Sequence, residues 1–524
     1  MRLGLVFPPS MPPTSPPCGI AYLKAFLGMG KTFDVNLDYH YILIDKALKG
    51  ELPPVVHCEN PEKLREAARF LKDAEAFYNI KEYNGNMSIF YDFFNSLYPY
   101  IQGECAKYLE GSADDFVVSL LEELTSPVKK YHPDVVGLSQ MVLPQREVCM
   151  ALASHLKSEG YHVVLGGASL WYNPEAYLSC KKCDLSKIFD AVFYGQGELA
   201  LKAYLEKEDL ERIPGIVYRK GTVIKNERKD LIDLDAAPCP DYSDFPLEQY
   251  YTPEIVLPVL TSRGCYWKRC TFCTHYRSYQ GYRVQSMEKV LSDLKELHNR
   301  YEASYFLLAD EMVHPHRYNE LSHCIIENGL DIRMYSEAKP TKEFTKPLLR
   351  TMYAAGVRAL LWGVESGTQR VLDLMDKGIC VHDVERVLKA SHEAGIWNMI
   401  FMIIGYPTQT REESEQDIAF LQKNAPYVST VTGSEFKLEK GSRMYEAPQQ
   451  YGIKEVGPSG EFSPVCEYVP VHPVEDADFL SKKYEVEFVV LSRGSWYFAR
   501  MRDHMLLFAD RVSENPLHTG GNLD

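Results

Sequence analysis

Apolar and polar positions near the N-terminus predict strands and helices in alternation. Residues 2–7 form a short apolar run typical of a strand, and a proline-rich loop follows it. The apolar spacing of residues 20–30 predicts a helix that stops at Gly30. Residues 33–41 have the pattern of a second strand. Strand, loop, helix and strand in this order begin a doubly wound parallel sheet, so the sequence predicts the α/β class.

The same pattern resumes later in the N-terminal half, with strands expected at 134–140, 162–169 and 190–198 and a helix at 146–160. Residues 58–130 separate the two parts of this pattern and combine helical periodicity with many aromatic residues. We interpret them as a helical insertion in the sheet domain. The insertion is either a packed helical subdomain or a lid over a ligand bound at the sheet, since aromatic stripes at helical spacing usually belong to a core.

A second alternation begins near residue 255, where six apolar segments predict strands that are separated by helical spacing. These segments are residues 255–262, 305–311, 332–338, 357–365, 399–407 and 428–436. Thr410 and Glu413 have the spacing of a capping box at the start of one of the helices. Six such units predict a parallel sheet, curved or closed, with helices outside. Ligands gather at the carboxyl ends of the strands in such a sheet.

Composition and charge narrow the class of protein. A chain of 524 residues is too long for one ordinary core, so two or three domains are expected. A net charge of −15 argues against nucleic acid as the main partner, because non-specific binding to phosphates needs clustered Lys and Arg. No apolar run is long enough to span a bilayer, so we expect a cytoplasmic protein without a membrane partner. Its 13 cysteines then indicate metal ligation or burial rather than disulfides.

The stretch TSRGCYWKRCTFCTHY brings Cys265, Cys270 and Cys273 together just beyond the first strand of the second half. Three thiolates at this spacing hold either a structural zinc, with a fourth protein ligand, or a [4Fe-4S] cluster with one open iron. The candidates for a fourth zinc ligand are His275, Cys324 and the pair Cys180 and Cys183. A structural zinc has little reason to lie where ligands gather, so this position favours the cluster. Cys180 and Cys183 lack a second pair and are interpreted as ordinary thiols.

The cysteine stretch resembles the cluster loop of the radical S-adenosylmethionine (SAM) superfamily. The usual spacing in that superfamily is C-x3-C-x2-C, whereas this chain has C-x4-C-x2-C. The flanking TSRGC and CTFC fit, with Phe272 just before the last cysteine. The resemblance implies that Cys265, Cys270 and Cys273 bind three irons, that SAM chelates the fourth, and that reduction cleaves SAM to a 5′-deoxyadenosyl radical. It also implies a partial (β/α)6 barrel.

The ends of the later strands are similar to the SAM-binding positions of this superfamily. LLADE corresponds to the site of the SAM amino group, YSEA to ribose and carboxylate contacts, WGVESG to polar contacts, and IIGYP to the adenine. The residues that this similarity implies for SAM binding are Phe272, Asp310, Glu311, Ser336, Glu337, Glu365, Ser366, Ile404, Gly405 and Tyr406.

The N-terminal half resembles the cobalamin-binding domain that precedes the barrel in one branch of the superfamily. The resemblance rests on a proline-rich opening, a serine followed by a Gly-Gly pair, and the later turn YGQGE. The implied cobalamin-binding residues are Pro8, Pro9, Ser139, Gly166, Gly167, Gly195, Gly197 and Glu198. Asp38 and His40 form a D-x-H pair, but position 43 is Leu rather than Gly. We therefore expect His40 to be a core or surface residue, and cobalamin to bind without a protein histidine on cobalt.

These features predict a cobalamin-dependent radical SAM enzyme, with a [4Fe-4S] cluster, SAM and cobalamin as cofactors. The function expected is C-methylation of an unactivated carbon in a natural product or peptide. A radical rearrangement or cyclisation without methyl transfer is an alternative, and a cobalamin- or redox-sensing binding protein is another. An electron donor such as flavodoxin or ferredoxin is implied as a partner. The expected domains are a Rossmann-like cobalamin domain at 1–225, a linker at 226–254, the barrel at 255–445 and a capping or substrate module at 446–524.

Overall fold

The computed structural model describes the chain except for residues 57, 180–186, 229–230, 473–481, 483–494 and 513–524. The chain forms two compact units. Unit 1 comprises Met1–Pro253 and Glu461–Ser463, and unit 2 comprises Glu254–Gly460 and Pro464–Asp524. Of the segment 226–254, expected to be a linker, residues 226–253 lie within unit 1 and Glu254 begins unit 2. Within that segment, the Tyr250 hydroxyl donates to Asp34 over 2.6 Å and the Tyr251 N–H donates to the Pro13 carbonyl over 2.9 Å.

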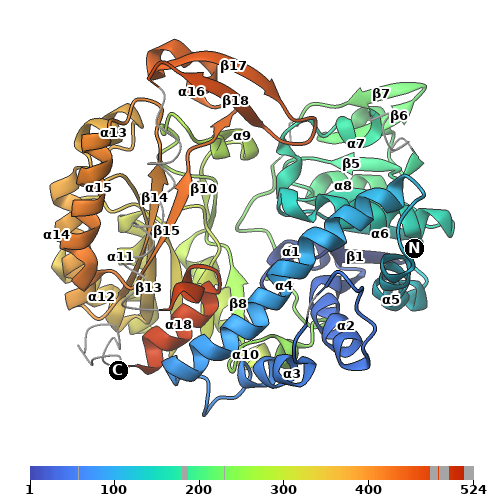
Figure 1. Cartoon of the computed structure of the whole chain (residues 1–524), viewed down its shortest axis with the longest axis horizontal. Coiled ribbons are helices and arrows are strands. Elements are labelled where there is room, and N and C mark those ends of the chain that lie inside the picture. Colours follow the sequence, from blue (N-terminus) through green and yellow to red (C-terminus); the bar gives the residue numbers. More distant parts are fainter. Residues whose placement is uncertain (57, 180–186, 229–230, 473–481, 483–494, 513–524) are drawn as a thin grey trace. The chain divides into compact units, whose positions relative to one another are not determined.

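Unit 1 contains a seven-stranded sheet in the order β2-β1-β3-β4-β5-β6-β7 (Figure 1). Its strands are β1 (Leu3–Phe7), β2 (Lys31–Asp34), β3 (Val135–Ser139), β4 (His162–Gly166), β5 (Ala191–Phe193), β6 (Ile216–Lys220) and β7 (Thr222–Lys225). The pairings among β1 to β5 are parallel, whereas β6 and β7 are antiparallel to their neighbours. Helices α1 (Cys18–Leu27), α6 (Arg146–Ser158), α7 (Ala176–Ser179) and α8 (Glu198–Leu205) connect the strands. The expected doubly wound beginning is thus present.

The insertion between the two parts of this sheet is helical, as the periodicity predicted. It contains α3 (Pro61–Phe70), α4 (Ile80–Leu109) and α5 (Asp115–Tyr131). Helix α4 packs against α3, α5 and α6, and its buried face carries Phe90, Phe93 and Phe94. The aromatic stripe therefore serves as core. Neither the long α4 nor any other helix in the described part of the chain is long and apolar enough to cross a bilayer.

Two predictions for the first elements were wrong. Helix α1 ends at Gly28, which takes a left-handed backbone with φ 62°, and not at Gly30. Strand β2 ends at Asp34, where the predicted strand should have continued, and helix α2 (Val35–Lys49) begins there. The Asp34 carboxylate accepts a hydrogen bond of 3.1 Å from the Leu37 N–H and so caps the helix.

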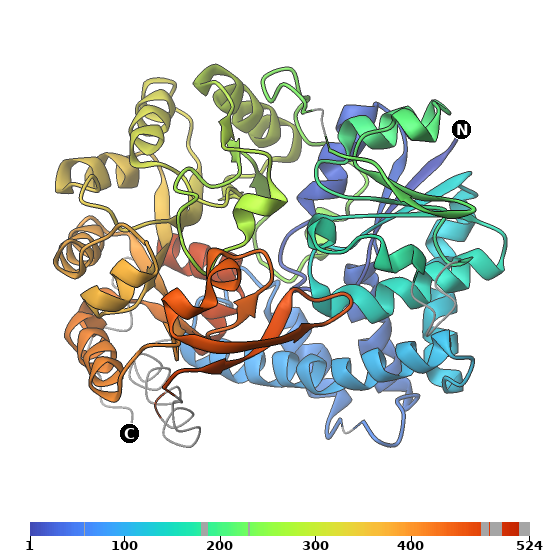
Figure 2. The same ribbon diagram turned by 90° about the horizontal axis from the view of Figure 1, so that it is seen from above.

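Unit 2 is built on a six-stranded parallel sheet in which consecutive strands are neighbours. Part of this sheet is labelled in Figure 1, and Figure 2 shows the same ribbon turned by 90°. Its strands are β8 (Val256–Val259), β11 (Tyr305–Leu308), β12 (Arg333–Ala338), β13 (Val357–Glu365), β14 (Trp397–Ile404) and β15 (Thr430–Glu435). The helices between them are α10 (Met287–Tyr301), α11 (Pro315–Glu327), α12 (Lys346–Ala354), α13 (Gln369–Leu374), α14 (Val381–Glu393) and α15 (Arg411–Asn424). All six predicted strands are present, and Thr410 and Glu413 form the expected capping box.

The remaining elements of unit 2 are short. They are β9 (Ser262–Arg263), β10 (Arg283–Val284), α9 (His275–Ser278), α16 (Arg443–Glu446), and a three-stranded sheet of β16 (Leu438–Glu439), β17 (Ile453–Ser459) and β18 (Val465–Pro470). Helix α18 (Arg502–Arg511) packs against β11, β12 and β13. Its Asp510 accepts hydrogen bonds from Tyr305 and Arg333, and its Asp503 accepts one from Tyr335. Because Tyr335 and Ser336 alternate along β12, and Ser336 contacts Tyr318 of α11, α18 covers the face of the sheet opposite α11.

Candidate functional site

The segment that leads to the three cysteines is fixed at the carboxyl ends of β8 and β11. Asp310, just beyond β11, accepts 3.1 Å hydrogen bonds from the N–H and the hydroxyl of Thr261 and a further one from the Ser262 hydroxyl. Burial raises the pKa of Asp310 to about 6. Asp310, predicted to contact SAM, thus anchors the start of the cysteine loop, and its direct SAM contact stays a prediction.

The cysteine loop is clamped against the turn that follows α13. The Thr271 N–H donates to the Met375 carbonyl over 2.9 Å, and the Trp267 ring N–H donates to the Asp376 carbonyl over 2.7 Å. The Trp267 ring lies so close to Gly378 that a Cβ there would be 2.1 Å from a ring carbon. Gly378, with φ 65°, therefore lets the turn approach the loop.

The additional residue between the first two cysteines is accommodated within this clamp. Lys268 takes a left-handed backbone with φ 55° and its side chain is exposed. On one side of it Trp267 binds the Asp376 carbonyl, and on the other the Arg269 guanidinium donates to the Asp376 carboxylate over 3.0 Å. Lys268, the third of the four spacer residues, is thus turned outward while its neighbours hold the loop in place.

Two buried lysines lie beside the cysteines. Lys377 is 2.7 Å from the Glu365 carboxylate, and Lys339 donates to the Lys377 carbonyl over 3.2 Å. The Cys270 thiol acts electrostatically on both lysines. Burial raises the pKa of Cys273 to about 12 and lowers that of Lys339 to about 8. Burial works against the thiolate form that a metal requires, whereas the neighbouring cations favour it, so the two lysines offset part of the cost of thiolate ligands here.

The spacing of the thiols favours a cluster over a single zinc ion. Among the described residues, the one trio of His, Cys, Asp or Glu with ligand atoms all within 4.8 Å of one another is Glu122, His155 and Glu159. At least one pair of the three cysteine sulfurs is therefore more than 4.8 Å apart, whereas Zn–S bonds of about 2.3 Å impose roughly 3.8 Å between sulfurs in a tetrahedral site. A four-iron cluster binds each cysteine at a separate iron and needs the wider spacing.

The possible fourth zinc ligands do not strengthen the zinc interpretation. His275 forms an ion pair with Glu311, and Cys324 lies within α11. Cys180 and Cys183 lie outside the described residues. The Glu122, His155 and Glu159 trio in unit 1 is already compensated by Lys129, whose Nζ is 2.6 Å from Glu122 and 2.8 Å from Glu159.

Glu365 ends β13 in a strained and enclosed position. Its φ is 71°, which is rare for a residue with a side chain, and it is only 9% exposed. Gly363 leaves room for the ion pair, because a Cβ there would be 2.7 Å from the Lys377 ammonium. Strain of this kind is retained where a side chain must be held in one place, which supports a binding role for Glu365.

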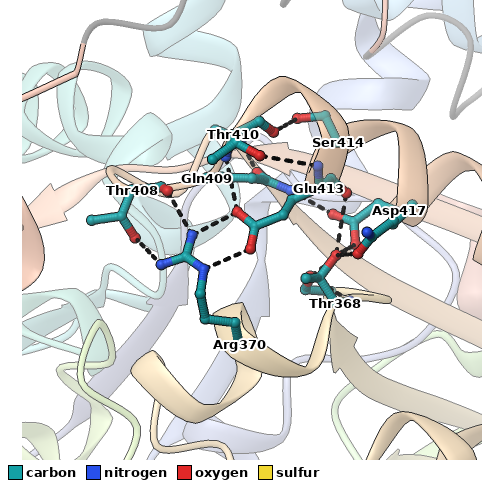
Figure 3. Close-up of polar contacts among 11 residues, drawn as sticks. Thr368, Arg370, Thr408, Gln409, Thr410, Glu413, Ser414 and Asp417 are labelled. Carbon is teal, nitrogen blue, oxygen red and sulfur yellow. Dashed lines mark hydrogen bonds and ion pairs between the residues drawn. The ribbon is translucent and has the colours of Figure 1, made fainter.

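Ser366 and Gly405 are joined by a buried network around Asp417 of α15, and Figure 3 labels Asp417 and Gln409 of this network. The Ser366 hydroxyl and the Gly367 N–H donate to Asp417 over 2.8 and 2.6 Å. The Gln409 amide donates to Asp417 over 2.7 Å and accepts from the Gly405 N–H over 3.1 Å. This network couples the loop after β13 to the loop after β14, and both loops are among the segments predicted to contact SAM.

A second ion pair supports the same two loops. The Arg370 guanidinium makes two 2.6 Å hydrogen bonds to the Glu413 carboxylate and a third to the Thr408 carbonyl (Figure 3). Glu413 also accepts from the Thr410 N–H over 2.9 Å. The start of α15 is thereby fastened to α13, so the positions of both loops depend on contacts between distant parts of the chain.

The remaining predicted SAM residues point in different directions. Glu311 pairs with His275, and Glu337 accepts a 2.9 Å hydrogen bond from Arg502 of α18. Glu311 and His275 also act electrostatically on Glu337, so these three form one group. Ser336 is buried on the other face of β12, where it contacts Tyr318 of α11. It therefore packs between the sheet and this helix.

The end of β14 approaches the cysteine loop through Tyr406. Its buried hydroxyl donates to the Leu374 carbonyl over 3.3 Å and lies 3.4 Å from the Thr271 hydroxyl. Ile404 ends the strand and Gly405 follows it, whereas Phe272 lies half-buried in the cysteine loop. Tyr406 therefore links the predicted adenine segment to the clamp.

The residues predicted to bind cobalamin follow the carboxyl ends of strands in unit 1. Pro8 and Pro9 follow β1, Ser139 ends β3, Gly166 ends β4 and is followed by Gly167, Gly195 and Gly197 follow β5, and Glu198 begins α8. A Cβ at Gly167 would be 2.1 Å from the Gln140 carbonyl oxygen, so the loops after β3 and β4 approach there more closely than any side chain allows. The edge of the sheet where α/β proteins bind ligands thus collects these positions.

His40 lies in the core of unit 1, as expected for a residue that is not a cobalt ligand. It belongs to α2, its Nδ1 is 2.7 Å from the Asn36 carbonyl oxygen, and its ring is 4.4 Å from that of Phe94. Burial lowers the pKa of His40 to about 4, so the ring is neutral. It serves as a packed and hydrogen-bonded core residue.

Sequence reasoning missed four contributors to the site: Lys339, Asp376, Lys377 and Asp417. Lys377 is buried although it lies in a polar DKG turn, two residues after Met375, and Asp417 lies in a helix of mostly polar residues. The buried face of α15 carries Phe420 and Leu421 but also Glu413, Asp417 and Asn424, so the apolar periodicity of this helix does not single out Asp417. Nothing in the local sequence indicates Lys339.

Comparison with known proteins identifies the domain that carries this site. Residues 259–421 match the model of the radical SAM superfamily. A protein of Pyrococcus horikoshii named uncharacterized methyltransferase PH0819 is 28% identical over 352 residues, which cover 65% of this chain and 74% of that protein. The anaerobic magnesium-protoporphyrin IX monomethyl ester cyclase of Cereibacter sphaeroides is 24% identical, over 56% of this chain and half of its own length.

Two solved structures share the fold. One is the cobalamin-dependent SAM radical enzyme OxsB with aqua-cobalamin and SAM bound, at a TM-score of 0.63 and 15% identity, covering 97% of this chain and 72% of OxsB. The other is the radical SAM methyltransferase TsrM of Kitasatospora setae with cobalamin and a [4Fe-4S] cluster bound, at a TM-score of 0.56 and 13% identity, covering 95% and 90%. The three predicted cofactors are thus the ones named for these proteins. The prediction of an enzyme is confirmed, and residues 259–421 of this chain are a radical SAM domain.

Proposed function

We propose that this chain is a cobalamin-dependent radical SAM methyltransferase that adds a methyl group to an unactivated carbon of a natural product or peptide. The observation that carries the proposal is the loop of Cys265, Cys270 and Cys273, clamped at the carboxyl edge of a six-stranded parallel sheet beside two buried lysines. A relative named as a methyltransferase and the fold shared with TsrM support methyl transfer.

The residues of unit 2 suit the binding of a cluster and of SAM. Cys265, Cys270 and Cys273 would hold three irons, and Glu365 would meet SAM from the end of β13. Unit 1 would hold cobalamin at the loops after β3 and β4, where Gly167 admits close backbone approach. When bound, these cofactors supply hydrogen-atom abstraction and a transferable methyl group. A protein electron donor such as flavodoxin or ferredoxin would supply the electron.

The protein's own residues fix the positions of the predicted SAM-binding loops and cover one face of the sheet. The Asp417 network and the Arg370 and Glu413 pair fix the two loops after β13 and β14 relative to the cysteines. Helix α18 covers the face of β12 that carries Glu337, and its Arg502 binds that carboxylate. We propose that the C-terminal region acts as a capping or substrate-contacting module of the domain. Fixed polar groups of this kind lower the cost of ordering reactants.

Radical rearrangement or cyclisation with the same cofactors is the second candidate, because two of the relatives are named as cyclases. Turnover products distinguish the two. Methylation should consume about two SAM molecules per product and yield 5′-deoxyadenosine and S-adenosylhomocysteine in about equal amounts. The measurement is mass spectrometry of both products under anaerobic turnover with a strong reductant. Formation of 5′-deoxyadenosine without S-adenosylhomocysteine and without added methyl would leave rearrangement as the function.

Cobalamin binding has its own test in unit 1. Protein produced with cobalamin should retain it through gel filtration, and His40→Phe should leave the cobalt absorption spectrum unchanged, because His40 is buried against Phe94. Gly167→Ala should reduce retention, since its Cβ would meet the Gln140 carbonyl. Gly103→Ala is the control, because a Cβ there meets no atom within 4 Å. A spectrum altered by His40→Phe would make His40 a cobalt ligand after all.

A further inference from the structure

Lys339 is a buried charge without a carboxylate partner. It follows β12, is 1% exposed, and its Nζ donates to the Lys377 carbonyl over 3.2 Å. The Nζ also lies 3.2 Å from the ring centroid of Trp267. In the part of the chain that the structure describes, no carboxylate lies within ion-pair distance of this ammonium. A buried ammonium costs several kcal/mol unless an opposite charge compensates it.

Among the described residues, the cysteine thiols are the negative groups that can compensate the Lys339 ammonium from a buried position. Glu365 is engaged by Lys377 at 2.7 Å, and Glu343 acts on Lys339 from an exposed position. The Cys265 and Cys270 thiols also act on Lys339, and the residues between them, Tyr266 and Trp267, lie with their rings against its Nζ. The ammonium is thus held against the inner side of the cysteine loop.

We propose that Lys339 is the fixed counter-charge of the cluster that the three cysteines hold, and that it raises the reduction potential of that cluster. The proposal rests on the proposed function, because it requires the cluster. Three thiolates around a [4Fe-4S] core give an anionic site that gains one more negative charge on reduction. A fixed positive charge in a low-dielectric surrounding stabilises the more negative form, so reduction becomes easier.

The geometry separates this role from general packing. Lys377 has its own carboxylate, whereas Lys339 has an aromatic ring on one side and the thiols nearby. Lys268, in the same loop, has an exposed side chain. Water screens an exposed charge strongly. The buried Lys339 should therefore influence the reduction potential of the cluster much more than the exposed Lys268, although both lie near the cysteines.

The test compares Lys339→Met, Lys339→Arg and the control Lys268→Met in anaerobically reconstituted full-length protein. Iron and sulfide content is measured first, and the midpoint potential is then determined by a redox titration followed by electron paramagnetic resonance. Lys339→Met should retain the cluster and shift the potential in the negative direction, with at least a tenfold change in the one-electron equilibrium, or about 59 mV. Lys339→Arg should restore the wild-type potential, and Lys268→Met should leave it unchanged.

Failure of the proposed function and failure of the proposed role of Lys339 give different experimental results. Wild-type protein without iron and labile sulfide would contradict the proposed function, whereas a loaded Lys339→Met protein with an unchanged potential would contradict the role of Lys339. If the Lys339→Met protein does not bind the cluster, the unfolding temperatures of the cluster-free wild-type and variant proteins are compared to test the role of Lys339. Removal of an uncompensated buried charge should raise the unfolding temperature of the cluster-free variant. A decrease would show that Lys339 is a structural contact and overturn the inference.

Discussion

Replacing Cys265, Cys270 and Cys273 together with alanine should abolish iron and labile sulfide binding, with the content falling from about four of each per chain to none. The absorbance near 400 nm expected of such a cluster should disappear as well. Formation of 5′-deoxyadenosine should fall to background, because no remaining group in the loop can bind SAM through iron. Iron and sulfide assays on anaerobically reconstituted protein, with absorption spectra, measure the effect.

Cys380→Ala is the matched control for this variant, because Cys380 is an exposed cysteine of the same unit. It should keep full iron content. The clamp between Trp267 and Asp376 does not involve the sulfurs, so the triple variant should fold with an unchanged circular dichroism spectrum. Stoichiometric zinc without labile sulfide in the wild-type protein would contradict the cluster and return the site to structural zinc.

Glu365→Ala should stop the formation of both 5′-deoxyadenosine and S-adenosylhomocysteine, and it should destabilise the protein. The variant leaves the Lys377 ammonium buried without its carboxylate, which lies 2.7 Å away in the wild-type protein. Breaking a buried pair in this way costs about 3–5 kcal/mol. It also removes the side chain that the end of β13 holds in a left-handed backbone. The yields of 5′-deoxyadenosine and S-adenosylhomocysteine, the SAM dissociation constant and the denaturant midpoint report the two effects.

A double variant separates structure from binding. Glu365→Ala with Lys377→Met removes both charges, so much of the lost stability should return while SAM affinity stays low. Glu296→Ala is the control, because its pair with Arg300 is exposed on α10 and should change neither quantity measurably. Recovery of SAM affinity in the double variant would show that Glu365 acts only as the partner of Lys377 and does not meet SAM.

The sequence predicted the order of elements in unit 2 because strand and helix periodicity is a local property. Each of the six strands is a short apolar run between segments of helical spacing, and consecutive runs became neighbours in the sheet. The same reasoning failed at residues 35–41. Val35, Leu37 and Tyr39 are apolar at alternate positions, which is the pattern of a strand. In the structure they belong to α2, whose buried residues also include His40, Leu43, Ile44 and Ala47. The Asp34 cap decided between the two patterns.

Within the candidate site, the sequence by itself indicated the three cysteines through their residue type and spacing, and Glu365 through the resemblance of the WGVESG segment to a SAM-binding position; both stay predictions. The tertiary structure decided what surrounds them: the turn at Asp376 that holds the loop, the lysines at 339 and 377, and Asp417 between two loops. Lys339 follows β12, Asp376 and Lys377 lie in the turn after α13, and Asp417 belongs to α15. Nothing in their local sequence distinguishes these residues from surface charges. Only the folded chain buries them, and burial is what makes their charges matter.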